Sequence, residues 1–295
     1  MTEASQTYDW IAPLSMFVLM FGMGLSLSIA DFKRVVSRPR AASAGSVLQL
    51  VAMPLLGLLL VFSFSLTPWL AAGLMATAAL PGGLLSNLVC HIGRADTALS
   101  ITLTSISTAV AIFTLPLWID AGFSVAGSGA ESANLPILST ALELSLLTLL
   151  PVGLGMWTRQ HAPRMARYET LLTRVSGLVL LVALVMDSRD NPSPSAQDFT
   201  ASLWPTLILM LAALLLSGGW ARLMRLSWRE TTTITIELCV KNSVLGLFVA
   251  VQSLDSLEAG VPILIFGSLQ VPVSIGLVLA YNLYLRKLDE ETHAT

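Results

Sequence analysis

Three polar residues, Glu237, Lys241 and Asn242, interrupt a stretch that is otherwise apolar enough to lie in a membrane. An ionisable side chain in hydrocarbon costs about 2.5–3.5 kcal/mol on insertion scales, so these groups should face a protein interior or a wet cavity. If the stretch is helical, Glu237 and Lys241 share one face and can form an intrahelical ion pair. Alternatively, Glu237 supplies the negative charge of a cation site and Lys241 a fixed positive charge beside it. Both can hold at once.

A second polar interruption lies far upstream, in Pro81-Gly-Gly-Leu-Leu-Ser-Asn87. We expect a helix to break at Pro81, Gly82 and Gly83, because proline lacks the amide hydrogen and glycine is flexible. A break at membrane depth is tolerated only where the backbone lines a cavity or is buried in protein. A packing kink is the simpler interpretation, but Ser86 and Asn87 follow at once and favour a site.

Three further polar side chains lie inside apolar segments. Ser100 and Thr104 are four residues apart and therefore share one face of a helix. Their hydroxyl oxygens suit Na⁺, a hard cation that prefers oxygen ligands. Taken alone, they fit hydrogen bonds between helices better. Gln49 lies in the middle of an earlier segment, where a buried amide needs a partner.

These residues belong to a chain whose composition is typical of an all-α membrane protein. Of its 295 residues, 55% are hydrophobic and only 12% are charged, whereas soluble domains carry about 25% charged residues. The chain has no basic stripe and no zinc-type spacing of cysteine and histidine, which argues against a nucleic-acid partner. Two cysteines do not indicate a disulfide scaffold.

Because a span needs about 20 apolar residues, the sequence predicts nine transmembrane helices. They are residues 10–30, 43–65, 69–91, 97–119, 135–158, 168–187, 200–222, 230–252 and 260–285. With this layout, 14 of the 16 lysines and arginines fall on one side of the membrane, Arg189 falls on the other, and Lys241 lies inside. The positive-inside rule makes the first side cytoplasmic, which predicts an N-terminus outside and a C-terminus inside.

The two polar interruptions fall in the third and eighth predicted spans, which run in opposite directions. Opposite directions are what an inverted repeat requires. The second half then has five spans and the first only four, so the repeat lacks its first helix. We expect the two breaks to meet and to form the working site of a transporter.

The motifs at these positions resemble the bile acid:sodium symporter family. The resemblance covers residues from about 10 to 285 and rests on Met20-Phe-Gly-Met-Gly-Leu25, Leu80-Pro-Gly-Gly-Leu-Leu-Ser-Asn87 and Thr235-Ile-Glu-Leu-Cys-Val-Lys-Asn-Ser243. It implies one transporter unit, residues 1–295, in which two broken helices cross near mid-membrane. It further implies that a panel rocks against a core. The panel would comprise 10–30, 135–158 and 168–187, and the core 43–65, 69–91, 97–119, 200–222, 230–252 and 260–285.

The resemblance also implies two sodium sites. The first would use Ser86, Asn87, Ser100, Thr104 and Glu237. The second would use Gln49, Glu237, backbone carbonyls near Leu238 and Val240, and a glutamine where this chain has Lys241. An ammonium there would repel Na⁺ and replace its charge, so we expect coupling to one Na⁺. Coupling to a proton through Lys241 or Glu237, or sodium-independent transport, is the alternative.

The implied function is secondary active transport of a small or amphipathic organic anion by alternating access, in a bacterial inner membrane. The family's substrate positions correspond to Leu84, Asn87, Asn242 and Gln270, and the N-termini of half-helices at the breaks would favour an anion. No cofactor is expected besides the coupling ion. A channel would need charged rings or filter carbonyls, and an enzyme a nucleophile–base pair or a metal set; the sequence favours neither.

Overall fold

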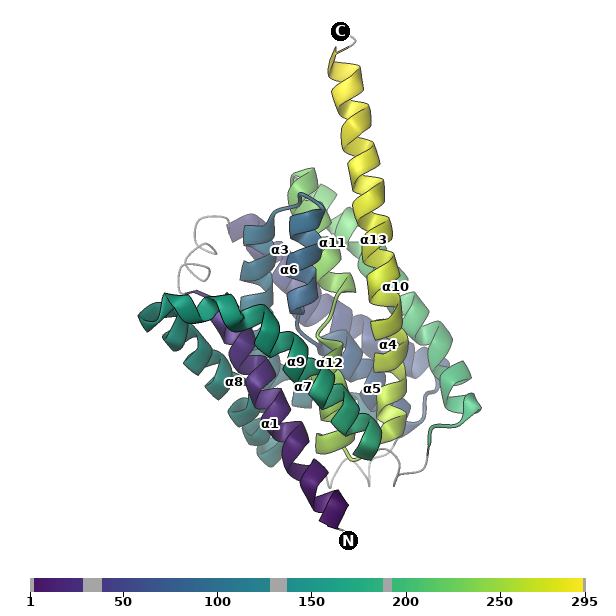
Figure 1. Ribbon diagram of the computed structural model, residues 1–295. Helices are drawn as coiled ribbons and strands as arrows, with labels where there is room; N and C mark the ends of the chain where they lie inside the picture. Colours follow the sequence, from purple (N-terminus) through teal and green to yellow (C-terminus); the bar gives the residue numbers. More distant parts are fainter. Residues whose placement is uncertain (1–2, 29–38, 128–136, 188–192, 294–295) are drawn as a thin grey trace.

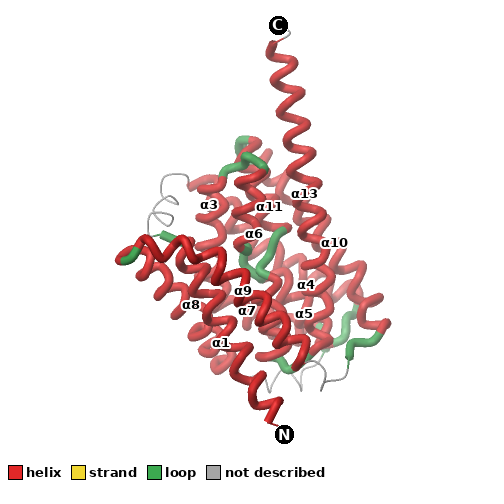
Figure 2. Tube along the Cα trace, in the orientation of Figure 1, coloured by secondary structure: helices red, strands yellow, loops and turns green. Residues whose placement is uncertain are grey.

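The computed structural model describes residues 3–28, 39–127, 137–187 and 193–293. Regular structure in these ranges is helical, and Figure 2 shows no strand among them. The α-helices are α1 (Glu3–Ser26), α3 (Pro39–Val47), α4 (Met53–Phe64), α5 (Pro68–Ala79), α6 (Leu84–Ile92), α7 (Thr97–Val125), α8 (Ile137–His161), α9 (Glu169–Asp187), α10 (Ala196–Leu223), α11 (Trp228–Cys239), α12 (Ser243–Phe248) and α13 (Leu257–His293). The other helical turns are η1 (Leu48–Ala52) and η4 (Val249–Ser253), which are π-helical, and the 3₁₀ segment η3 (Pro163–Tyr168).

Three continuous helical segments are long and apolar enough to cross a membrane: Pro39–Phe64, Ala196–Leu223 and Leu257–Asn282. A fourth is obtained if the two parts of α7, which meet at 62° around residue 112, count as one span. Shorter apolar helices include Pro68–Ala79 and Ser243–Ser253, which lie beside the helix breaks. The multi-pass membrane character is thereby confirmed, while the number nine and the orientation of the termini stay predictions.

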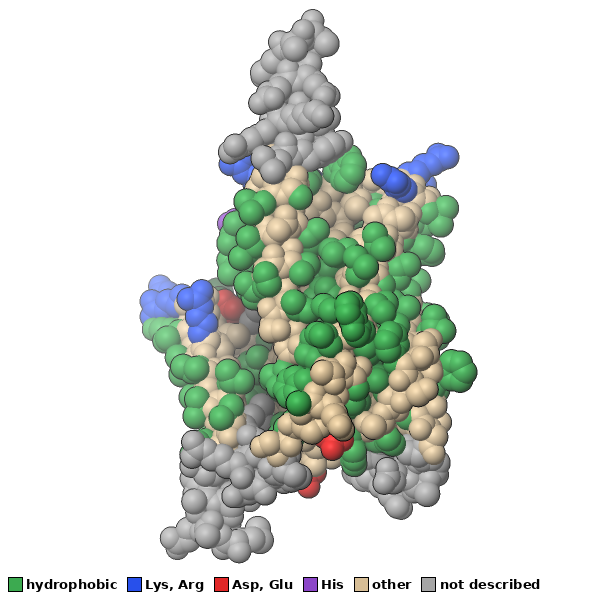
Figure 3. Space-filling model, turned by 90° about the vertical axis from the view of Figure 1, so that its right-hand side faces the viewer, with side chains coloured by type: hydrophobic (Ala, Val, Ile, Leu, Met, Phe, Trp, Pro, Cys, Tyr) green, Lys and Arg blue, Asp and Glu red, His purple; other side chains and the backbone are tan. Residues whose placement is uncertain are grey.

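The outer surface supports this membrane assignment. Large apolar side chains are exposed on helices far apart in the chain, such as Phe62 at 73%, Leu215 at 66% and Leu178 at 64%. The face drawn in Figure 3 carries hydrophobic side chains across its middle, with lysine and arginine toward its top and left edge. An apolar surface of this extent would be costly in water and is expected against lipid.

Helices α1, α8 and α9 pack together as one layer at the lower left of Figure 1. Glycines permit the close approach: a Cβ on Gly24 would lie 2.2 Å from the carbonyl oxygen of Val152. Arg159 of α8 then ties the end of α1, because its Nη1 donates to the carbonyls of Leu25, at 3.1 Å, and of Ser26. These helices fall in the predicted panel segments; that they move against the rest stays a prediction.

The remaining long helices, α4, α5, α7, α10, α11 and α13, pack against one another in a second group. α5 lies against α7 and α13, and α10 lies against α11 and α13. Figure 1 shows α13 running up one side of the molecule and projecting beyond the other helices. The short helices α6 and α12 lie toward the first layer, and α12 contacts both α1 and α9.

Candidate functional site at the crossing of two helix breaks

The two polar interruptions are both breaks in the helical backbone, and they touch. α5 ends at Ala79 and α6 begins at Leu84, while α11 ends at Cys239 and α12 begins at Ser243. Between them, Gly82 and Lys241 form an isolated antiparallel bridge. Gly83 N donates to Val240 O at 3.3 Å, and Asn242 N donates to Pro81 O at 3.0 Å. Each break thus satisfies backbone groups that the other leaves without helical partners.

Three side chains make hydrogen bonds that stabilise the second break. Asn242 caps α12, since its Oδ1 accepts from Leu245 N at 3.1 Å. Gln270 on α13 accepts from the backbone N of Lys241 through Oε1 at 3.0 Å. The ammonium of Lys241 turns toward the first break and donates to Leu80 O at 3.0 Å. The interpretation of Glu237 and Lys241 as an intrahelical ion pair is therefore wrong: α11 ends before Lys241, and the structure records no ion pair between these two described residues.

Glu237, only 1% exposed, is the centre of a cluster of oxygen atoms. Ser86 Oγ donates to its Oε1 at 2.6 Å, and Ser100 Oγ donates to the same atom. Thr104 Oγ1 lies 3.1 Å from Oε1 and 3.0 Å from Oε2. Asn87 joins through Ser100, whose Oγ is 2.8 Å from Asn87 Oδ1. The structure thus brings together all five residues proposed for the first cation site.

The cluster has more hydrogen-bond acceptor oxygens than hydroxyl hydrogens to donate to them. Ser86 Oγ lies 2.6 Å from Gly83 O as well as 2.6 Å from Glu237 Oε1, and Ser100 Oγ likewise approaches both Asn87 Oδ1 and Glu237. Each hydroxyl has one hydrogen, so neither serine can donate to both neighbours. Oxygen atoms crowded around a buried carboxylate are suited to a hard cation. Three or more His, Cys, Asp or Glu side chains placed to hold a metal ion are not found in the described ranges.

The residues predicted for a second cation site are buried but differently engaged. Gln49 lies in η1 at 1% exposure, and its Nε2 has no hydrogen-bond partner. Leu238 and Val240 are fully buried. The carbonyl of Val240 already accepts from Gly83 N, and Lys241 donates to Leu80 O. No recorded hydrogen bond links the described side chains of Gln49 and Lys241.

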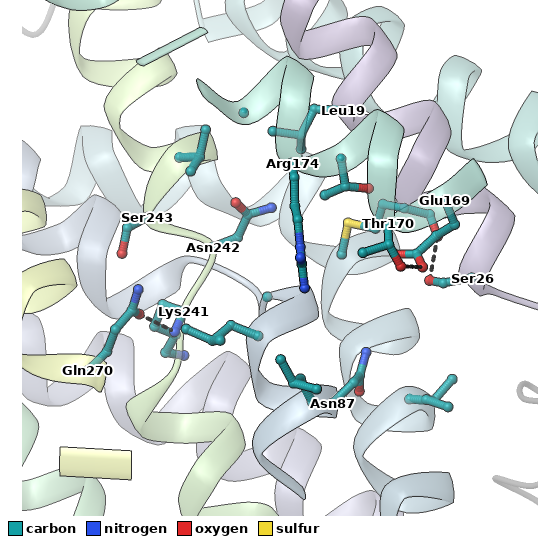
Figure 4. A pocket seen from close by; sticks show the side chains of 18 of the residues that line it. Leu19, Ser26, Asn87, Glu169, Thr170, Arg174, Lys241, Asn242, Ser243 and Gln270 are labelled. Atoms are coloured by element: carbon teal, nitrogen blue, oxygen red, sulfur yellow. Dashed lines mark hydrogen bonds between the residues drawn. The ribbon is translucent and has the colours of Figure 1, made fainter. Parts of the chain in front are cut away.

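A cavity of about 610 Å³ opens beside the crossing. Figure 4 shows its polar part, where side chains from α6, α9, α13 and the second break converge. The lining includes Asn87, Asn242 and Gln270, three of the four residues predicted to contact substrate. Leu84 begins α6, and its side chain lies outside the described part. Apolar side chains line the cavity too, among them Leu19 and Met23 of α1.

Sequence reasoning missed Arg174, His91 and Glu169 in the lining. Arg174 was counted only among the basic residues of one membrane side. A signal was available, since Arg174 lies within the apolar segment 168–187 and not in a junction. His91 has no role in the sequence-based predictions above. Neither position could be assigned to a cavity before the packing of α9 against α12 was known.

Fold and site together define a helical membrane protein in which two interrupted helices of opposite direction cross around a buried carboxylate, an organisation typical of secondary transporters. The chain belongs to the Sodium Bile acid symporter family: the family's sequence model matches residues 13–190, more than half of the chain. The resemblance seen in the motifs is thereby confirmed.

Individual relatives agree with this assignment. The chain is 30% identical to the uncharacterized sodium-dependent transporter YocS of Bacillus subtilis (strain 168), over 88% of this chain and 80% of that protein. It is 28% identical to the human sodium-dependent organic anion transporter, over 95% of this chain and 75% of that protein. These relatives are transporters and not enzymes.

A third relative is the probable sodium/metabolite cotransporter BASS1, chloroplastic, of Arabidopsis thaliana. It is 26% identical over 87% of this chain. The chain spans 64% of that protein's length, which is slightly less than two thirds.

Proposed function

We propose that this protein is a secondary active transporter that moves an organic anion together with one Na⁺ by alternating access. The names of its relatives support sodium coupling and an anionic or metabolite substrate. The observation that carries the proposal is the oxygen cluster at the crossing. Ser86, Ser100 and Thr104 surround the carboxylate of Glu237 there.

The cluster is proposed as the Na⁺ site for two physical reasons. A buried carboxylate that makes no direct ion pair is costly, and a cation bound to it would reduce that cost. The oxygens come from α6, α7 and α11, so one ion would bind elements on both sides of the crossing. Asn87 would contribute its amide oxygen, which already lies against Ser100.

Lys241 is proposed to take the place of a second cation. Lys241 is 2% exposed and its ammonium donates to Leu80 O at 3.0 Å, so a fixed positive charge already lies at the crossing. Gln49, Leu238 and Val240 would be left as remnants of the second site. Since Val240 O accepts from Gly83 N, that carbonyl is less free to ligate an ion.

The proposed movement follows from the two helix groups. The layer of α1, α8 and α9 would act as the panel and the other group as the core, so that the cavity between them opens to one membrane side at a time. The protein would lie in a bacterial inner membrane with the N-terminus outside and the C-terminus in the cytoplasm. The basic residues of the predicted junctions support this orientation.

Sodium binding is tested by thermal unfolding of the purified protein in NaCl and in KCl at equal ionic strength. Na⁺ should raise the unfolding midpoint of the wild type, because a ligand that binds the native state stabilises it. The increment should vanish in Glu237→Gln and shrink in Ser100→Ala. Ser105→Ala is the matched control: Ser105 is buried on the same helix, but its hydroxyl donates to Ile101 O at 2.6 Å. Equal increments in Glu237→Gln and wild type would exclude the site.

The role of Lys241 is tested by stoichiometry in proteoliposomes. Sodium and charge moved per substrate should correspond to one Na⁺ in the wild type. Lys241→Gln should gain a second, cooperative sodium dependence, because the ammonium is gone and an oxygen ligand stands in its place. Two Na⁺ per cycle in the wild type would refute the replacement.

A further inference from the structure

We propose that Arg174 of α9 binds the carboxylate of an amphipathic organic acid in the cavity beside the crossing, and that this arginine selects acids over their neutral analogues. The inference rests on the proposed transport function and names the substrate class and a residue that recognises it.

The geometry places Arg174 where an anion would enter. Its side chain lines the cavity of about 610 Å³ together with Asn87, Lys241 and Asn242. In Figure 4 it extends from α9 into the cavity, toward the start of α6 and toward Asn87. The structure records no hydrogen bond or ion pair from the Arg174 guanidinium to another described residue. Glu169, the acidic residue of the lining, instead accepts from its neighbour Thr170 at 2.9 Å.

A guanidinium without a protein partner is well suited to a ligand carboxylate. Its planar fork donates two parallel hydrogen bonds to the two carboxylate oxygens, which a compact ammonium does not. Lys241 is the other lysine or arginine of the lining, but its ammonium already donates to Leu80 O, and His91 has no planar fork of donors. Among the described residues of the lining, Arg174 is therefore the cation available for bidentate recognition.

The rest of the lining defines the body of the ligand. Leu19 and Met23 of α1, Leu85 and Leu88 of α6, and Val244 of α12 are apolar and face the same cavity. A volume of about 610 Å³ lies in the range of pockets that bury a drug-sized molecule, roughly 300–1,000 Å³. The ligand should therefore combine one carboxylate with a compact hydrophobic body.

The net charge around the cavity couples binding of this anion to binding of Na⁺. Arg174 and Lys241 are positive, while Glu169 and the buried Glu237 behind the lining are negative, so the four charges cancel. A Na⁺ at Glu237 would leave one positive charge in excess and favour the anion. Asn87 connects the two places, since it lines the cavity and contacts Ser100 of the oxygen cluster.

The experiment measures binding by thermal unfolding of the purified full chain, in NaCl and in KCl. The probes are phenylacetate, naphthylacetate and adamantylacetate, each paired with its primary amide, and phenylmethanesulfonate as a differently shaped anion. The variants are Arg174→Gln, which removes the charge, and Arg174→Lys, which keeps the charge and loses the fork. Arg164→Gln is the matched control, because Arg164 is an exposed arginine of η3 that does not line the cavity.

In the wild type, at least one carboxylate should stabilise the protein in NaCl, and its amide should not. Arg174→Gln should weaken that binding about 10- to 100-fold, as expected for a charged hydrogen-bonded pair. Arg174→Lys should give an intermediate loss, and Arg164→Gln none.

Three results would overturn the inference: no carboxylate stabilises the wild type, acid and amide act alike, or Arg174→Gln binds the acid as the wild type does. Tighter binding of the sulfonate would overturn the choice of headgroup. Stabilisation by Na⁺ alone in Arg174→Gln shows that this variant is folded and that the cation site stands. If Na⁺ alone did not stabilise the wild type, the proposed function itself would be rejected.

Discussion

The two helix breaks meet at one point but are built differently. The first contains Pro81, Gly82 and Gly83, three residues that disfavour a continuous helix by their own backbone chemistry. The second, at Val240, Lys241 and Asn242, has neither proline nor glycine. It is held by backbone pairing with the first break, by Gln270 and by the cap of Asn242.

The two breaks therefore contribute different things to the site. The first supplies flexibility and space: Gly82 lies so close to Glu237 that a Cβ there would be 2.1 Å from Oε2. The second supplies the charges, Glu237 at the end of α11 and Lys241 just beyond it. Because the second break has little local cause, it should depend on the first far more than the first depends on it.

The largest effect is expected from Gly82→Ala. The added Cβ would displace the Glu237 carboxylate and would lie 3.1 Å from Thr104 Oγ1. Overpacking of this kind costs about 1–3 kcal/mol, and the stabilisation by Na⁺ should be lost. Gly83→Ala is the control, because its Cβ would lie 3.3 Å from Lys241 O and not near the carboxylate. Unfolding curves with and without Na⁺ measure both; an unchanged sodium response in Gly82→Ala would contradict this account.

The next effect is expected from Gln270→Leu. Gln270, which the family resemblance assigns to substrate contact, is the acceptor of the Lys241 backbone N–H, and the substitution removes that acceptor. Leaving a buried donor unsatisfied costs about 1–3 kcal/mol, so the variant should unfold more easily even without ligand. Ser268→Ala, exposed on the same helix and bonded to Ile265 O, should be neutral. Unchanged stability of Gln270→Leu would show that the second break does not need α13.

A smaller effect is expected from Asn242→Ala, which removes the cap of α12. Loss of an N-cap costs about 0.5–2 kcal/mol, and serine is an adequate substitute. Asn242→Ser should therefore retain most of the stability that Asn242→Ala loses. Equal losses in both variants would indicate that the amide is needed for something other than capping.

The smallest effect is expected from Pro81→Ala. Asn242 N donates to the carbonyl of residue 81, which alanine also has. The main loss is the proline's restriction of the unfolded chain, about 0.4–1 kcal/mol. Sodium stabilisation should persist. Loss of that stabilisation in the unfolding assay would mean that the proline ring itself, and not the pairing of the breaks, maintains the crossing.

Much of the candidate site was predictable because its polar residues stand out against apolar surroundings. Backbone chemistry predicts the break at Pro81-Gly-Gly, and resemblance to a family groups Glu237 with the four residues around it. The spacing of Glu237 and Lys241 predicts an intrahelical ion pair, which is wrong. Nothing in Thr235-Ile-Glu-Leu-Cys-Val-Lys241 stops a helix locally, so local backbone chemistry does not indicate the break there. The stop after Cys239 depends on partners more than a hundred residues away, at Pro81 and Gly83.

The sequence by itself determined that the chain is helical and apolar, that one helix breaks at Pro81, and that a carboxylate must be sheltered at Glu237, because these follow from local backbone chemistry and the cost of burying charge. The tertiary structure alone decided the partners: that Lys241 turns to Leu80, that Gln270 supports a backbone amide, and that Arg174 enters the cavity. Such contacts depend on how helices distant in sequence pack and face one another, which the local spacing of residues does not fix.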